Sequence, residues 1–116
     1  MKNLILDFLQ RKNIQIPKIG EEYEGELICY VRFGIPKWDF FIYEIDEKGD
    51  FANSLVYSPY TNNIPDHGLI PLKDFLKSYR EEFPSDGFDM YSVKIDEEFS
   101  PTPLKEVMRL KREWQK

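Results

Sequence analysis

The sequence predicts a single α+β domain, in which one antiparallel sheet of about four to five strands is packed against N-terminal, middle and C-terminal helices. A chain of 116 residues has the size of one domain, which we place at residues 1–116. Its composition, 41% hydrophobic and 16% aromatic, is sufficient for a packed core. Helical and strand-like periodicities also alternate along the chain in an order typical of α+β domains.

Three segments show the helical pattern. Residues 3–11 place apolar side chains on one side of a helix, with Asn3 positioned to cap its start. Residues 71–82 form the second expected helix, with Pro71 at its first position. The third covers residues 104–116, with Thr102 as its cap. Its expected apolar stripe consists of Leu104, Val107, Met108 and Trp114.

Strand patterns occupy the segments between these helices. We expect strands at residues 25–33, 38–45, 51–57, 67–70 and 88–95. Apolar residues occur on both faces of 38–45, so this strand should be central and covered on both sides. We expect Trp38, Phe40 and Ile42 on one face and Phe41, Tyr43 and Ile45 on the other; in the first strand, Leu27, Cys29, Val31 and Phe33 should share one face.

A hairpin is predicted between the second and third strands. Residues 46–50 are short, polar and acidic, and Gly49 is the natural residue for a left-handed backbone conformation. A longer polar loop, residues 58–66, follows the third strand. Long loops in small domains often carry function, and the tyrosine, asparagine and histidine side chains of residues 57–68, which include this loop, suit a contact role.

The charge is negative and unevenly distributed. The net charge of the chain is −5. The last predicted helix holds five bases and two acids and so carries +3, which leaves a net charge of −8 on the residues before it. The acids form three groups: Glu21, Glu22, Glu24 and Glu26; Asp39, Glu44, Asp46, Glu47 and Asp50; Asp86, Asp89, Asp96, Glu97 and Glu98. An acidic body repels phosphate backbones, which argues against direct nucleic-acid binding.

The residues for common catalytic and metal chemistry are scarce. The one cysteine, Cys29, lies in an apolar run, and the one histidine is His67. One cysteine and one histidine are too few ligands for a structural zinc site. We therefore expect a buried thiol, no catalytic residues, no metal and no cofactor. Asp39 and Glu44 lie within the apolar central strand, and each is expected to pair with a base such as Arg32 or Lys94 on a neighbouring strand. No apolar run reaches the length of a membrane span, and we expect a cytoplasmic protein.

Several segments together resemble a known family. They are residues 16–19, 30–33 with Pro36, 38–46, 67–75 and 99–104, so the similarity covers roughly residues 16–107. The chain resembles a family of small bacterial proteins carried largely by plasmids, phages and other mobile elements, domain-of-unknown-function family 2958. It departs from that family around Gly68-Leu69-Ile70, where an aromatic and acidic run is usual. The resemblance implies an accessory protein of a mobile element and supplies no catalytic residues.

Three functions are consistent with these features. The first is a non-enzymatic acidic binding protein, an inhibitor of a basic host defence or nucleic-acid-binding protein. Its expected contact residues are Asp46, Glu47, Asp50, Tyr57, Tyr60, Asn62, Asn63, Asp66 and His67. The second is a small-molecule or nucleotide binder, or a minor enzyme, with a pocket lined by Trp38, Tyr43, Tyr57, Tyr60 and His67. The third is a homodimer formed through an open strand edge or the Trp114 helix. We favour the first.

Overall fold

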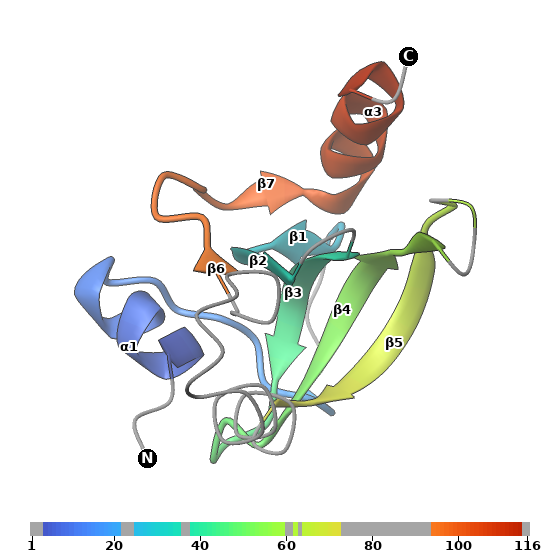
Figure 1. The fold of residues 1–116 in the computed structure, drawn as a ribbon. Helices are drawn as coiled ribbons and strands as arrows, with labels where there is room; N and C mark the ends of the chain where they lie inside the picture. Colours follow the sequence, from blue (N-terminus) through green and yellow to red (C-terminus); the bar gives the residue numbers. More distant parts are fainter. Residues whose placement is uncertain are drawn as a thin grey trace, which may run out of the picture.

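The computed structural model describes residues 4–21, 25–35, 38–59, 62, 64–72 and 94–114 (Figure 1). Its helices are α1 (Leu4–Arg11) and α3 (Leu104–Trp114). Its strands are β1 (Ile28–Cys29), β2 (Val31–Ile35), β3 (Trp38–Ile45), β4 (Phe51–Tyr57), β5 (Asp66–Pro71), β6 (Lys94–Ile95) and β7 (Thr102–Pro103).

The strands confirm the α+β class and the antiparallel sheet. Five strands pair in the order β5-β4-β3-β2-β6, and β1 and β7 form a separate two-stranded sheet. All these named strand pairs are antiparallel. β3 lies in the middle of the larger sheet, as its two apolar faces predict, and the bounds of β3 and β4 are those expected from the sequence.

The helices differ from the prediction in number. The described residues contain two helices, at the two ends, where three were expected. Pro71 was predicted to begin the middle helix, but it is the last residue of β5 and lies opposite Phe51. The next residue, Leu72, has a helical backbone conformation. The remainder of the predicted middle helix, residues 73–82, lies outside the described residues. So do residues 88–93 of the last predicted strand, of which β6 is the described part. No helix in the described part of the chain is long and apolar enough to cross a membrane.

The two helices cover opposite faces of the sheet. α1 contributes Ile5, Phe8 and Leu9 to a core that continues through the β2, β3 and β4 side chains of one face. α3 contributes Leu104 and Val107 to a second core on the other face. Figure 1 shows α1 and α3 far apart, on different sides of the sheet. Both faces of the central strand are therefore buried.

A β-bulge changes the side of one core residue. Ile42 lies opposite Ser54 and Glu44 lies opposite Asn53, so Tyr43 is an extra residue in β3. The inserted residue shifts the alternation, and Ile45 therefore packs with Phe40 and Ile42 in the α1-side core. The prediction that Ile45 shares a face with Phe41 was wrong, because simple alternation assumes an unbroken strand.

A second interruption divides the first predicted strand. The segment 25–33 was expected to be one strand with Cys29 and Val31 on the same face. Tyr30 separates β1 from β2, with its N–H bonded to the Ile42 carbonyl at 2.8 Å. Cys29 packs in the α3-side core and Val31 in the α1-side core, so the predicted single face was wrong.

The start of α3 also differs from the prediction. Thr102 was expected to cap the helix, but its hydroxyl donates a hydrogen bond to the Ser100 carbonyl at 2.8 Å. Thr102 and Pro103 form β7, which pairs with β1. The N–H of Leu104 donates a hydrogen bond to the Leu27 carbonyl at 2.8 Å. The backbone carbonyl of Leu27, the residue before β1, thus satisfies the first N–H of the helix.

Candidate binding surface

The acidic hairpin between β3 and β4 is held by its own first residue. The Asp46 carboxylate accepts the Phe51 N–H at 2.9 Å, and the Asp46 carbonyl accepts the Gly49 N–H at 3.0 Å. Gly49 has a φ of 77°, which confirms the predicted left-handed position. Asp46 is therefore fixed by the turn, whereas Glu47 is exposed and Asp50 is partly exposed.

The second predicted contact region lies at the other end of β4, where the chain passes from β4 into the first residues of β5. Asp66 and His67 are exposed, and the Asp66 carboxylate accepts the His67 N–H at 2.9 Å. His67 Nδ1 lies 3.0 Å from the Tyr43 hydroxyl in a hydrogen bond across the sheet. Asn62 is exposed with a φ of 54°, while Tyr60 and Asn63 lie outside the described residues. The hairpin and this loop are at opposite ends of β4 (Figure 1).

The charge of this side of the molecule is largely unneutralised. Residues 44–71 contain five acids and one lysine, which gives −4 of the chain's net −5. β4 and β5 contain no lysine or arginine. Among the described residues, the ion pairs formed by arginine and lysine involve other acids: Asp7, Asp39, Asp96, Glu97 and Glu106. The negative charge of the β3–β5 region is therefore available to an external partner.

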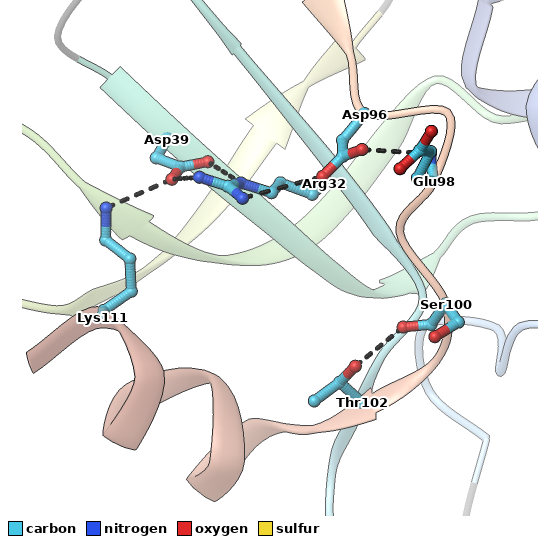
Figure 2. Close-up of polar contacts among 7 residues, drawn as sticks. All are labelled: Arg32, Asp39, Asp96, Glu98, Ser100, Thr102 and Lys111. Carbon is cyan, nitrogen blue, oxygen red and sulfur yellow. Dashed lines mark hydrogen bonds and ion pairs between the residues drawn. The ribbon is translucent and has the colours of Figure 1, made fainter. Parts of the chain in front are cut away.

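A separate polar cluster joins α3 to the sheet. Arg32 on β2 donates two hydrogen bonds to Asp39 on β3, at 3.1 and 2.9 Å. Lys111 on α3 approaches the same carboxylate at 3.2 Å, and Asp96 lies 3.7 Å from the Arg32 guanidinium. Figure 2 shows Arg32 between the two carboxylates and Lys111 extending from α3. The predicted pairing of Asp39 with Arg32 is confirmed, whereas Glu44 accepts a hydrogen bond from Asn53 at 3.2 Å.

This cluster rests on aromatic rings of the α3-side core. The Arg32 guanidinium lies 5.4 Å from the centre of the Phe41 ring, and the Lys111 ammonium lies 4.8 Å from that of Tyr57. Burial has the largest single effect on the pKa of Arg32 and lowers it, but the hydrogen bonds with Asp39 and the negative charges of Asp39 and Asp96 together outweigh burial and raise the pKa. The Lys111 contact was not predicted, because the two residues are 72 positions apart and no local pattern links them.

The cluster is suited to a structural role. Two bases face two acids, so their formal charges balance and leave no excess charge for a ligand. The shared Asp39 carboxylate connects β2, β3 and α3. We assign these residues to holding the helix on the sheet, and the acidic side of the molecule remains the candidate binding surface.

The aromatic residues proposed as a pocket lining do not converge. Trp38 packs with Phe40 on the α1 side of the sheet, at a ring-centre distance of 5.9 Å. Tyr43 and Tyr57 belong to the α3-side core. The sheet therefore separates Trp38 from the other described members of this set. Tyr57 is only 2% exposed, and burial, with smaller contributions from Cys29 and Asp39, raises its pKa to about 12.

Comparisons with known proteins do not assign the chain. No family model, curated protein or solved structure matches it. The resemblance to family 2958 therefore stays a prediction. The described residues also contain no group of three or more histidine, cysteine, aspartate or glutamate side chains that could hold a metal ion.

The thiol of Cys29 is expected to be unreactive in the folded protein. Cys29 is completely buried, and burial raises its pKa from 9.0 to about 12. At a pH below both values, its thiolate fraction should be about a thousandfold lower than in the unfolded chain. We expect a disulfide reagent at pH 8 to modify the native protein far more slowly than the urea-unfolded protein. Equal rates in the two states would contradict the buried position.

Proposed function

We propose that this protein is a non-enzymatic acidic binding protein whose partner presents a basic protein surface. The observation that carries the proposal is the placement of −4 of the net −5 charge in residues 44–71, which comprise the end of β3, β4, β5 and the segments that connect these strands. The described acids there form no ion pairs with described bases. The resemblance to a mobile-element family supports a more specific role, inhibition of a basic host defence or nucleic-acid-binding protein.

The electrostatic basis is long-range attraction followed by local contact. Unpaired surface acids accelerate the encounter with a basic protein, and this effect weakens as salt screens the charges. The exposed acids of the hairpin should influence the association rate and its salt dependence more than they influence folding. Glu47 and Asp50 suit this test because neither has a hydrogen bond or ion pair within the described part of the chain, whereas Asp46 holds the turn.

We expect the double substitution Glu47→Gln and Asp50→Asn to weaken capture of basic proteins about three- to tenfold at low salt. The measurement is a pull-down from the cation-exchange-retained fraction of a bacterial lysate, quantified by mass spectrometry. It is made at about 20 mM and about 500 mM salt, since screening is strong at the higher concentration. A matched control, Glu21→Gln with Glu26→Gln, changes the net charge equally at exposed acids outside residues 44–71.

The proposal requires three results together. A specific set of basic proteins is retained at low salt, the hairpin variant retains less of it, and the control variant retains as much as the natural sequence. Retention of basic proteins that is equally reduced by both variants would indicate only nonspecific charge attraction. No retention, or retention that is insensitive to salt, would contradict the proposed function.

A further inference from the structure

The register of the sheet shows how the backbone of β5 is oriented. In an antiparallel pair, successive residues alternately direct their N–H and C=O groups toward the neighbouring strand and away from it. Ile45 forms backbone hydrogen bonds with residues 17 and 19, on the side of β3 away from β4. Ala52, which lies opposite Ile45, must therefore direct its backbone groups toward β5, where its partner is Ile70. Ile70 thus faces β4.

The outer side of β5 is consequently rich in acceptors. Alternation from Ile70 leaves the backbone groups of three residues directed outward: His67, Leu69 and Pro71. The His67 N–H already donates to the Asp66 carboxylate, and Pro71 has no N–H. Leu69 therefore supplies the one free donor on this side of β5, beside three carbonyl acceptors. Within the described sheet, β5 is an outer strand and these carbonyls have no neighbouring strand.

This arrangement disfavours pairing of β5 with a second copy of itself. In an antiparallel pair centred on Leu69, the two Leu69 residues could exchange two hydrogen bonds. His67 of each copy would lie opposite Pro71 of the other. Pro71 has no N–H, and the N–H of His67 already donates to the Asp66 carboxylate. The four carbonyls at these positions would remain unbonded, and unsatisfied polar groups are costly at an interface. An Asp side chain and a proline are also recognised means of protecting a sheet edge.

A foreign strand can satisfy the same edge. An antiparallel segment with N–H groups at three alternate residues could form four backbone hydrogen bonds, two with Leu69 and one with each flanking carbonyl. The side chain of Leu69 is 59% exposed, and Phe51 on the same face of the sheet is 45% exposed, which provides an apolar contact. Asp66 lies at one end of this edge and Asp50, beside Phe51, at the other, so both ends attract positive charge.

We propose that β5 binds an extended, basic segment of a partner protein by strand addition, with an apolar side chain against Leu69 and lysine or arginine toward both ends. This inference rests on the proposed function and specifies how the same acidic side recognises its partner. Because β5 has six residues, the contact between β5 and the added strand would be about 20 Å long.

The test uses an acetylated, amidated seven-residue peptide with lysine at both ends and alternating valine and threonine between them. Two modified forms carry N-methyl groups on one or the other set of alternate internal residues, so charge and side chains are unchanged. Strand addition turns only one set of N–H groups toward β5. We expect one methylated peptide to bind at least about tenfold more weakly than the unmodified peptide and the other to bind within about threefold, measured by fluorescence anisotropy.

Two measurements on the protein complete the test. The Leu69 amide should exchange with solvent more slowly when the unmodified peptide is saturating. The substitution Leu69→Pro removes the outward donor without removing a β4–β5 ladder bond, and it should weaken binding more than Leu69→Thr, which keeps the N–H. If Leu69→Pro does not fold, the methylated peptides and the amide exchange on the natural sequence still decide the question.

The outcomes separate this inference from the function on which it rests. Equal affinities of the two methylated peptides, no change in Leu69 exchange, or no binding of the unmodified peptide would overturn strand addition. If the basic protein fraction is still retained through Glu47 and Asp50, the acidic binding function stands alone. If neither that fraction nor the peptide binds, both proposals fail. Dimerisation through β5, seen by light scattering, would also overturn the inference.

Discussion

Replacing Phe41 with alanine is expected to reduce the free energy of unfolding by about 3–5 kcal/mol. Phe41 is only 1% exposed, and its ring contacts Tyr57 and Phe99 at centre distances of 6.1 and 5.8 Å. Truncation would leave a cavity in the α3-side core and remove the ring beneath Arg32. Because domains are stable by about 5–15 kcal/mol, this loss should populate the unfolded state measurably. Urea unfolding followed by circular dichroism provides the measurement.

The matched control for this substitution is Phe51→Ala. Phe51 lies on the same face of the sheet, but it is 45% exposed, so its truncation should cost less than about 1 kcal/mol. The comparison keeps the chemical change constant and varies only burial. Equal losses for the two variants would contradict the assignment of Phe41 to the core and of Phe51 to the exposed part of the sheet.

Replacing Asp39 with alanine should have the second-largest effect, a loss of about 2–4 kcal/mol. The Asp39 and Lys111 side chains are 17% and 14% exposed, so solvent compensates poorly for the missing carboxylate. The substitution leaves Lys111 without its acid and weakens the pairing of Arg32. We also expect faster hydrogen exchange in α3, because Lys111 connects this helix to the sheet.

A double substitution separates lost pairing from lost packing. Asp39→Ala combined with Lys111→Met removes both the carboxylate and the ammonium that faces it. This variant should be more stable than Asp39→Ala alone, because an uncompensated, partly buried charge costs more than the absence of the pair. A double variant that is less stable than the single one, or an Asp39→Ala loss below about 0.5 kcal/mol, would contradict the structural role of the cluster.

Local patterns were sufficient for the central part of the fold. β3 and β4 have the predicted bounds because apolar and β-branched residues continue through both strands and a polar segment with Gly49 separates them. The burial of Ile5, Phe8 and Leu9 in α1 also follows from helical spacing. The pairing of Asp39 with Arg32 was predictable because a charge within an apolar strand requires a partner close by.

The candidate surface was only partly visible in the sequence. The hairpin acids and the loop residues were identified as separate contact regions from composition. Their connection through the outer side of β5 was not, because the direction of the Leu69 backbone groups depends on the register between β4 and β5. Tyr57 was grouped with the contact residues on composition, but the α3-side core buries it.

The sequence by itself determined the fold class, the central hairpin and the concentration of negative charge in residues 44–71, since these depend on neighbouring residues and on local backbone preferences. Tertiary structure alone decided which face Cys29 and Ile45 occupy, which acid Lys111 contacts and which β5 backbone groups are free. Interruptions at Tyr30 and Tyr43 shift the alternation of side chains, and their positions are fixed by pairing with distant strands. Such long-range pairing leaves no periodic signal in the chain.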